Sequence, residues 1–346
     1  MSRVLVTGGG GFVGSHIAEQ LLADGHAVVV LDRAGRGHAP DGAELIEGDV
    51  RDADTVRRAL AGADAVSHQA AKVGLGVDLL DIDDYVSVND LGTAVLLREL
   101  ARARFGGRLV LASSMVVYGE GRYDCPRHGP TPAPPRAAAD LAAGRFEPRC
   151  PACGEALAPS VVPESAATDP RNVYAATKLH QEHLATAFGR ETGVPVTALR
   201  YHNVYGPRMP RDTPYAGVAA LFADALAAGR APRVFEDGGQ LRDFVHVRDV
   251  ARANVLALTC DQPAAGAFNV ASGTPRTIAD LATALHAAFP RAPRPRVTGE
   301  FRLGDVRHVF ASPARAAELL GFRAWEPFAA GIAEFADALH AGGTLR

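Results

Sequence analysis

A tyrosine and a lysine lie four positions apart at Tyr174 and Lys178. On a helix this spacing places both side chains on one face. A phenol with a pKa of about 10 is a poor base at neutral pH, whereas a nearby ammonium favours the phenolate and lowers that pKa. Only one other lysine, Lys72, occurs among the 36 basic residues. Because arginine is the usual cation of this chain, a retained lysine indicates chemistry that arginine does not supply.

A pair of serines, Ser113 and Ser114, follows the apolar run Leu109–Ala112, which we expect to form a buried strand. Open α/β sheets bind ligands at the carboxyl ends of their strands. Ser114, Tyr174 and Lys178 are therefore the candidate catalytic residues. Each of them taken alone is compatible with an ordinary structural position, and their combination with a nucleotide-binding loop is what favours catalysis.

That loop is Thr7-Gly8-Gly9-Gly10-Gly11-Phe12-Val13-Gly14, between an expected strand and an expected helix. The first glycine of such a loop permits a tight turn, the second lets the backbone approach a pyrophosphate, and the third lets helix and strand pack closely. The phosphates meet the positive N-terminus of the helix. Asp32 lies 18 residues beyond Gly14, where an acidic residue binds the ribose 2′-hydroxyl. The pattern predicts an NAD site, although the arginine after Asp32 keeps NADP open.

Cysteine and histidine occur in two short pairs, Cys125-x2-His128 and Cys150-x2-Cys153, with 21 residues between them. Three thiolates and an imidazole suit tetrahedral Zn²⁺, and four protein ligands leave no open position, which is typical of a structural site. Both pairs lie in residues 119–170, a segment rich in Pro, Ala and Arg with weak periodicity. Metal ligation can order a segment that lacks a core. A disordered loop with unrelated cysteines and a redox-active Cys-x2-Cys pair are the alternatives.

Apolar runs of strand length alternate with stretches of helical periodicity, most clearly over the first hundred residues. Strand–helix alternation with short connections predicts a parallel, doubly wound sheet. The expected strands are Val4–Val6, Ala27–Leu31, Leu45–Glu47, Ala65–His68 and Leu109–Ala112. The expected helices are Phe12–Ala23, Ala53–Leu60, Asp83–Arg102, Val173–Glu191, Gly217–Ala228, Val250–Leu258, Ile278–Ala288, Ala314–Leu320 and Gly331–His340.

We therefore predict an α/β protein with a Rossmann-type doubly wound parallel sheet and a smaller C-terminal α/β substrate-binding region. Residues 1–200 are expected to form the NAD-binding domain, with the insertion 119–170. Residues 201–346 are expected to form mainly the substrate region, with some segments returning to the sheet. The formal net charge of −3 provides no basic field for nucleic acid. No apolar run reaches the roughly 20 residues of a membrane span, and the N-terminus lacks a signal-type apolar region. We expect a cytoplasmic protein without nucleic-acid or membrane partners.

Further motifs extend along nearly the whole chain. They are Gly48-Asp49-Val50-Arg51-Asp52, His68-Gln69-Ala70-Ala71, Asn89 with Gly92-Thr93, Ser113-Ser114 with Tyr118-Gly119, Arg200-Tyr201-His202-Asn203-Val204-Tyr205-Gly206-Pro207 and Arg242-Asp243-Phe244-Val245-His246-Val247. With these motifs the chain resembles the extended short-chain dehydrogenase/reductase family, in its branch of nucleotide-sugar epimerases and dehydratases. His202 stands where that family usually has phenylalanine, and we assign it no role.

The resemblance implies two sets of binding residues. The expected contacts to NAD are Gly8, Gly11, Phe12, Val13, Gly14, Asp32, Asp49, Val50, Ala70, Ala71, Asn89, Tyr174 and Lys178, with Asp49 and Val50 at the adenine. The expected contacts to a nucleotide sugar are Lys72, Ser114, Asn203, Arg242, Asp305 and Arg307, with Asn203 and Arg242 at the diphosphate. For Lys72 a solvated loop position is an equal alternative.

The resemblance also implies a mechanism. Tyr174, as phenolate, takes the proton of a sugar hydroxyl while hydride passes to NAD, and Ser114 hydrogen-bonds the same oxygen. Return of the hydride to the other face of the sugar inverts the carbon. Dehydratases of this family carry an Asp-Glu pair after the catalytic Ser or Thr, whereas this chain has Met115 and Val116. The chain therefore resembles 4-epimerases, in particular a bacterial subgroup related to dTDP-L-rhamnose 4-epimerases. A dTDP-6-deoxyhexose, a UDP-hexose or UDP-glucuronate is the expected substrate.

Two other functions stay open. An NAD(P)H-dependent 4-ketoreductase would use the same three residues but would consume its cofactor stoichiometrically. A non-enzymatic NAD-sensing scaffold is more remote, since such proteins often lose the catalytic tyrosine or lysine. The resemblance further implies a homodimer through the helices Asp83–Arg102 and Val173–Glu191. The apolar residues expected to face the partner are Leu96, Leu97, Leu100, Leu179 and Leu184.

Overall fold

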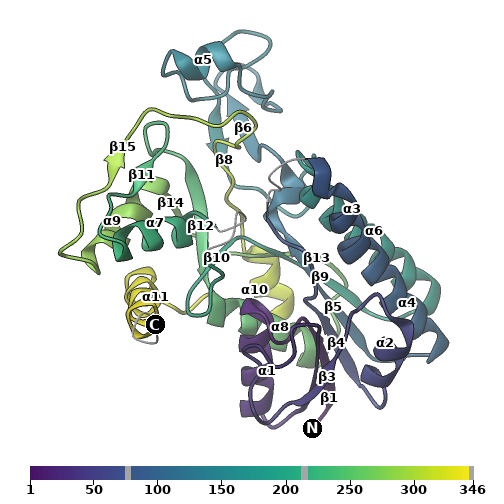
Figure 1. Ribbon diagram of the computed structural model, residues 1–346. Helices are drawn as coiled ribbons and strands as arrows, with labels where there is room; N and C mark the ends of the chain where they lie inside the picture. The colour runs from purple at the N-terminus through teal and green to yellow at the C-terminus, as the bar shows by residue number, and fades with distance from the viewer. Residues whose placement is uncertain (75–78, 212–216, 343–346) are drawn as a thin grey trace.

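A seven-stranded parallel sheet forms the centre of the protein (Figure 1). The structure, a computed structural model, describes residues 1–74, 79–211 and 217–342. The strands lie in the order β13-β9-β5-β4-β1-β2-β3. They are β1 (Arg3–Thr7), β2 (Ala27–Asp32), β3 (Glu44–Glu47), β4 (Ala65–His68), β5 (Arg108–Ser114), β9 (Val196–Tyr201) and β13 (Gly266–Val270).

Helices cover both faces of this sheet. One face packs against α1 (Phe12–Ala23), α8 (Val247–Thr259) and α10 (Ala314–Leu320). The other packs against α2 (Ala53–Ala59), α4 (Gly92–Arg102) and α6 (Val173–Thr192). The run Val28–Leu31 in β2 is buried on both sides, with alternate side chains in the two cores. Such double burial is why these strands are continuous apolar runs in the sequence. The predicted fold class is confirmed.

A second lobe is built mainly from later residues. Its sheet has the order β10-β12-β14, formed by β10 (Asn203–Tyr205), β12 (Leu241–His246) and β14 (Pro275–Thr277). It packs on α7 (Val218–Ala227), α9 (Ile278–Ala287) and α11 (Phe328–Gly342) around a core of its own. The short strands β11 (Arg233–Val234) and β15 (Arg296–Val297) pair at its edge. Because β13 belongs to the central sheet, the chain passes between the lobes more than once.

The expected helix Asp83–Arg102 is interrupted. It consists of α3 (Ile82–Tyr85), a π-helical turn η2 (Val86–Leu91) and α4, preceded by the 3-10 turn η1 (Leu79–Asp81). The π turn contains Asn89, which is fully buried, and such turns often occur at functional sites. Gly92 begins α4 against Val50, where an added Cβ would lie 2.7 Å from that side chain.

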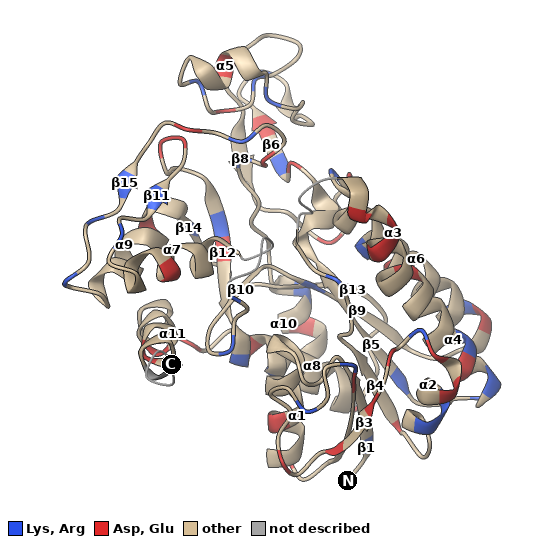
Figure 2. Ribbon diagram, in the orientation of Figure 1, with Lys and Arg blue, Asp and Glu red and all other residues tan. Residues whose placement is uncertain are grey.

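The leucines that the sequence analysis assigned to a partner helix are used within the chain instead. Leu96, Leu97 and Leu100 are buried in the core between the sheet and α2, α4 and α6, and Leu184 packs against that core. Leu179 packs against a separate small cluster formed by Val117, Tyr118 and Val162. The apolar residues that α3 and η2 expose are others: Ile82, Val86 and Leu91. Helix α3 carries acidic residues, whereas α4 carries both acidic and basic ones (Figure 2).

The insertion 119–170 is an ordered module that projects beyond the two lobes (Figure 1). It contains β6 (Arg122–Cys125), β7 (Gly129–Pro130), β8 (Ala158–Ser160) and the short helix α5 (Ala138–Ala142). Its buried core is small, consisting of Tyr123, Cys125, Ala133, Cys150 and Leu157. Within the described residues, no helix is both long and apolar enough to span a membrane.

Candidate active site

A crevice of about 790 Å³ opens at the carboxyl ends of the central strands and extends to the second lobe. This is the edge at which open α/β sheets bind ligands. Most of the predicted site residues line it: Gly8, Gly11, Phe12, Val13, Gly14, Asp32, Asp49, Val50, Ala70, Ala71, Lys72, Ser114, Tyr174, Lys178 and Asn203. The crevice therefore joins the predicted dinucleotide loop to the predicted catalytic residues.

The glycine loop has the close packing that its sequence predicts. Gly8 has a φ of +68°, and a Cβ on Gly14 would lie 2.2 Å from the carbonyl oxygen of Gly8. Helix α1 begins after Gly11 without a side-chain cap, so its first N–H groups point toward the crevice end of the helix. Asp32 accepts a hydrogen bond from the Gly10 amide at 2.9 Å, which ties the loop to the end of β2.

The residues predicted to contact the adenine, Asp49 and Val50, lie just after β3. Asp49 accepts hydrogen bonds from the Arg51 guanidinium at 2.9 and 2.6 Å, and these bonds lower the pKa of Asp49. Arg51 also donates to the hydroxyl of Ser87 in the π turn at 2.8 Å. Arg51 and Arg33 both line the crevice, although the sequence analysis assigned neither as a binding residue. Their signal was present, since Arg33 directly follows Asp32 and Arg51 lies two positions after Asp49.

The three candidate catalytic side chains converge. Asn172 accepts a hydrogen bond from the Ala175 amide at 2.8 Å and so begins α6 one turn before Lys178. The Lys178 ammonium lies 5.9 Å from the centre of the Tyr174 ring and donates to the Ala112 carbonyl at 2.9 Å. The Ser114 hydroxyl approaches the Tyr174 hydroxyl closely enough to favour the phenolate.

The pKa of the Tyr174 phenol is raised, whereas the sequence predicted that it would be lowered. Burial raises the pKa of Tyr174 to about 12, and the Ser114 hydroxyl offsets only part of this effect. Burial likewise lowers the pKa of Lys178 to about 8. The net shift is opposite to the expected lowering, because burial of the phenol dominates and Lys178 is not among the groups that shift this pKa.

Asn89 lies behind the crevice rather than in its lining. Its amide oxygen accepts from the Lys72 backbone N–H at 2.7 Å, and its amide nitrogen donates to the Lys72 carbonyl at 3.0 Å. The same nitrogen donates to the Thr177 hydroxyl at 2.9 Å. Asn89 thus connects the loop after β4 to the helix that carries Tyr174 and Lys178, which is a positioning arrangement.

A buried histidine extends this support to the glycine loop. Thr93 donates its hydroxyl proton to the Asn89 carbonyl at 2.6 Å, so His68 donates to Thr93 through Nε2 at 3.0 Å. The other ring nitrogen of His68 then accepts from the Thr7 hydroxyl at 2.7 Å. Burial lowers the pKa of His68 to about 3, which keeps the ring neutral as this pattern of hydrogen bonds requires. The hydroxyl of Thr7 also accepts from the Ala70 amide at 3.2 Å.

A second buried pair, Glu182 and Arg200, lies beside β5, the strand that carries Ser114. Glu182 on α6 accepts from the Arg200 guanidinium at 2.9 and 2.7 Å and also from the Ser113 hydroxyl. Arg200 in turn donates to the Tyr118 hydroxyl at 2.9 Å. Separating the pair would leave a buried charge without a partner and so lower the stability of the fold. The pair therefore fixes the positions of β5, β9 and α6 relative to one another.

Three predicted substrate residues do not line the crevice. Arg242 donates to the backbone carbonyls of Val306 and Arg307 at 2.7 and 2.9 Å. Arg307 is buried and ion-paired with acidic residues, and the carbonyl of Asp305 accepts from Arg136 at 2.7 Å. Segment 305–308 packs between the second lobe and the insertion, so these three residues lie outside the crevice lining, and their contact with a nucleotide sugar stays a prediction. The lining toward the second lobe is instead formed by Asn203, Met209, Pro210, Val218 and Phe244.

Lys72 does lie in the crevice lining. Its ammonium is 3.1 Å from Asp84 and 3.3 Å from Asp81. Tyr201 and His202, which the sequence motifs contained without an assigned role, also contribute to the wall. The lining residues Met209, Pro210 and Val218 lie outside the sequence motifs, and their spacing gives no signal of a binding role.

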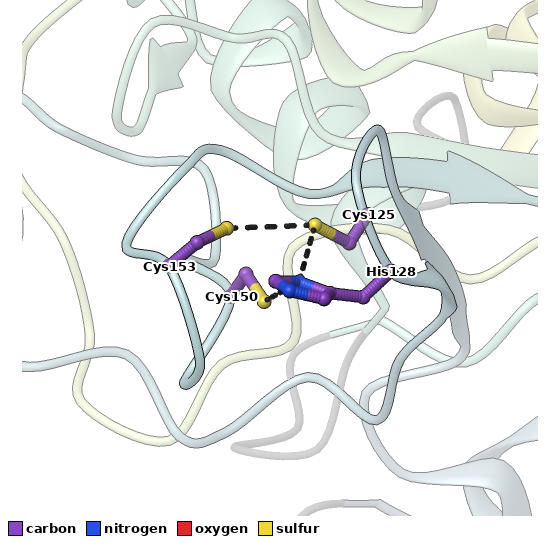
Figure 3. Close-up of side chains that lie close together, drawn as sticks. All are labelled: Cys125, His128, Cys150 and Cys153. Carbon is purple, nitrogen blue, oxygen red and sulfur yellow. Dashed lines mark hydrogen bonds between the residues drawn. The ribbon is translucent and has the colours of Figure 1, made fainter.

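The four predicted metal ligands converge in the insertion, from two separate turns of the chain (Figure 3). Their donor atoms all lie within 4.8 Å of one another. The Nδ1 atom of His128 is 3.4 Å from the Cys125 sulfur and 3.5 Å from the Cys150 sulfur, and the sulfurs of Cys125 and Cys153 are 3.7 Å apart. All four cysteines of the chain are free thiols. Donors about 2.3 Å from a tetrahedral Zn²⁺ would be separated by roughly these distances.

Comparison with known proteins decides the family. The model of the NAD dependent epimerase/dehydratase family matches residues 4–140 and 154–271. The chain belongs to this family. The unmatched residues 141–153 lie in the insertion and include Cys150 and Cys153.

Individual members of the epimerase/dehydratase family are similar over almost the whole chain. A dTDP-L-rhamnose 4-epimerase of Burkholderia thailandensis is 34% identical over 94% of this chain and 90% of its own. The UDP-glucose 4-epimerase of Thermus thermophilus, solved in complex with NAD, is 32% identical, with a TM-score of 0.79 over 98% of this chain and 99% of its own. The UDP-glucose 4-epimerase of Thermotoga maritima, solved with UDP-glucose, is 26% identical, with a TM-score of 0.80 over the same shares.

Proposed function

We propose that the protein is an NAD-dependent nucleotide-sugar 4-epimerase. The observation that carries the proposal is the meeting of Ser114, Tyr174 and Lys178 with the glycine loop in one crevice. Next to Ser114 the lining contains Met115, which has no acid–base function. This residue choice favours inversion at C4 over elimination, which needs further proton transfers at neighbouring carbons.

The proposed roles follow from the chemistry of each side chain. A bound nicotinamide would supply a reversible hydride acceptor for the sugar C4. Tyr174 would take the proton from the C4 hydroxyl and return it, while the Ser114 hydroxyl hydrogen-bonds the same oxygen. Lys178 would hold the phenol and the ribose in place. Because Tyr174 is protonated at rest, substrate and cofactor binding have to lower its pKa before it acts as a base.

NAD is the proposed cofactor form. Asp32 keeps its carboxylate at the end of β2, where it would repel a 2′-phosphate, and it is already bonded to the Gly10 amide. Denaturing the purified protein and assaying the supernatant tests this preference. We expect NAD, whereas NADP alone would contradict the proposed role of Asp32.

The proposed substrate is a dTDP-6-deoxyhexose, a UDP-hexose or UDP-glucuronate. Similarity to both a dTDP-L-rhamnose 4-epimerase and UDP-glucose 4-epimerases supports this range. The test is incubation with UDP-, dTDP-, GDP- and CDP-sugars without added cofactor, followed by NMR of the products. We expect a C4 epimer from one class of nucleotide sugar. Conversion only with stoichiometric NAD(P)H would indicate the alternative 4-ketoreductase.

We also propose that Cys125, His128, Cys150 and Cys153 bind one structural Zn²⁺ per chain. Their donor set and their separations fit a closed tetrahedral site, which leaves no ligand position for a reacting water. The small apolar core of the insertion supports a need for such a metal. Metal analysis after purification without chelators should find about one zinc per chain. Much less than one would contradict the site.

A homodimer is proposed through the outer surface of α3, η2 and α6. Ile82, Val86 and Leu91 expose about half of their side-chain surface there, at 47%, 46% and 51%. Sedimentation at micromolar protein concentration should find twice the chain mass of 36.2 kDa. A monomer under these conditions would contradict the proposal.

A further inference from the structure

The segment Asp305–His308, called the strap below, is held on one side by the second lobe. The Arg242 guanidinium on β12 donates to the carbonyls of Val306 and Arg307. The Leu241 amide donates to Nδ1 of His308 at 3.0 Å. These hydrogen bonds connect the strap directly to β12. The same strand carries Phe244, which lines the crevice and pairs with Asn203 in the adjacent strand.

The insertion holds the strap from the opposite side. The Glu147 carboxylate accepts from Arg307 at 3.0 and 2.8 Å and, through its other oxygen, from Nε2 of His308 at 2.8 Å. Because Nδ1 of His308 accepts from a backbone amide, Nε2 carries the ring proton and donates to Glu147. Arg136 donates to the Asp305 carbonyl at 2.7 Å. The insertion thus contacts the strap along its length.

These contacts are buried and charged. The side chains of Arg136, Glu236 and Arg307 are only 4%, 2% and 3% exposed, and Glu236 lies 2.8 Å from both guanidinium groups. Burial alone would raise the pKa of Glu147, but the hydrogen bonds from His308 and Arg307 outweigh it and lower that pKa. The Glu147 side chain is 37% exposed, and Arg307 also pairs with Glu236 and Asp237. Loss of Glu147 would therefore remove the bonds that join Arg307 and His308 to the insertion, while Arg307 would keep its partners in the second lobe.

Both insertion residues of this contact lie in the loop that the metal ligands close. Arg136 and Glu147 fall between His128 and Cys150, and Glu147 is three residues before Cys150. The apolar core of the module is too small to fix this loop by itself. Binding of one ion by both ligand pairs would close the loop and so determine where Arg136 and Glu147 lie.

The ends of the insertion lie next to the catalytic residues. Gly119 follows Ser114 by five positions, and Pro170 precedes Tyr174 by four. The module therefore begins and ends at the catalytic side of the crevice, while its contacts reach the strap and β12 on the other side. In Figure 1 the chain after β15 passes beside β6 and β8 on its way back to the central sheet.

We propose that the insertion is a metal-closed clamp that fixes the second lobe relative to the catalytic residues, with Arg136 and Glu147 as positioning residues. The clamp sets the separation between the Ser114 side and the Phe244 side of the crevice. Its effect on nucleotide-sugar binding rests on the proposed function, whereas its effect on the strap does not. Affinity for NAD should change little, since none of the bonds that hold the strap involves a residue of the glycine loop.

The test compares hydrogen exchange of peptides covering residues 302–311 in four full-length proteins, together with zinc content. They are the native chain, Cys150→Ser with Cys153→Ser, Glu147→Ala and the control Glu155→Ala. Glu155 is a matched control, because it forms an ion pair within the insertion, to Arg127 at 2.5 Å, and does not reach the strap. Glu147→Gln, which keeps an acceptor for Arg307, serves as the conservative variant.

We expect the cysteine variant to lose zinc and to exchange the strap at least about tenfold faster. Glu147→Ala should keep zinc and show similarly fast strap exchange, Glu147→Gln should be intermediate, and Glu155→Ala should resemble the native chain. In Glu147→Ala the KM for the nucleotide sugar should rise about tenfold with kcat nearly unchanged. Unchanged strap exchange in either the cysteine variant or Glu147→Ala would overturn the proposal. A chain that converts no nucleotide sugar would contradict the proposed function and leave the exchange result valid.

Discussion

The central sheet and the insertion are stabilised in different ways. The sheet is buried between two layers of helices, and its strands contribute large apolar side chains to both cores. The insertion buries few apolar residues and depends on four converging metal ligands and on buried ion pairs to its neighbours. Apolar burial tolerates small adjustments, whereas ligands and buried charges need fixed partners. The first region therefore provides a rigid support, whereas the order of the second would depend on the proposed metal.

The largest expected effect concerns chemistry on the sheet. Tyr174→Phe should reduce turnover by roughly 10²–10⁴-fold, because the proton acceptor and donor is lost. The free energy of unfolding should stay nearly unchanged, since the ring keeps its packing. Steady-state kinetics with the identified substrate and thermal unfolding measure the two quantities. Near-native turnover would remove Tyr174 from the mechanism.

A matched pair of leucine substitutions tests the comparison directly. Leu111→Ala opens the core beneath the sheet and should lower the free energy of unfolding by about 2–5 kcal/mol. Leu157→Ala removes the same group from the insertion core, where the side chain is equally buried. It should loosen only the insertion while the metal remains bound. Denaturant unfolding measures the global effect of each substitution, and proteolysis of the insertion measures the local effect. Equal global destabilisation would show that the two regions form one cooperative core.

The buried Lys178 should be required for turnover and should lower the free energy of unfolding. Below pH 8 Lys178 is held as an ammonium with little solvent, although its folded pKa of about 8 lies below its ordinary value. Lys178→Met should abolish turnover and raise the free energy of unfolding at pH 7 by up to about 3 kcal/mol.

The pH dependence of that gain has a definite sign. Between about pH 8 and pH 10 the unfolded native chain binds more protons than the folded one, so native stability rises with pH. The advantage of Lys178→Met should therefore shrink over this range. Urea unfolding at pH 7 and pH 9.5 measures it. A constant difference between the two proteins would contradict the buried ammonium.

The smallest global effect is expected from chelation. Removing the metal should leave the thermal midpoint of the central sheet almost unchanged, because the insertion contributes little to either main core. Proteases should then cleave within residues 119–170. Collapse of the whole structure on chelation would mean that the metal supports both regions.

The fold could be predicted from the sequence where the burial of an element produces a recognisable run or spacing of apolar residues. Strands such as Val28–Leu31 are continuous apolar runs because both of their faces are covered, and the glycine loop has a fixed spacing. The convergence of the four candidate metal ligands was predictable because the two pairs have the same internal spacing. The π turn at Asn89 was not, since it depends on hydrogen bonds to Lys72, far along the chain.

Tertiary contacts also account for the other differences. Leu96, Leu97 and Leu100 were expected to face a partner chain, but α2 and the sheet cover them. Arg242 occupies a motif position and Arg307 was expected to contact the substrate from the family resemblance. The immediate partners of Arg242 are the strap carbonyls, and those of Arg307 include Glu147 and Glu236. Sequence spacing does not reveal such partners, because the insertion and the second lobe supply them from distant segments.

The most direct test of the account is conversion of the nucleotide sugar in deuterium oxide, followed by NMR. If Tyr174 and Ser114 support internal hydride transfer at C4, the epimer forms without added cofactor and its C4 hydrogen is retained. No deuterium should enter C5, since Met115 and Val116 supply no acid or base there. Deuterium at C4 would indicate epimerisation by proton transfer, and deuterium at C5 would indicate elimination chemistry. Either result would contradict the central claim.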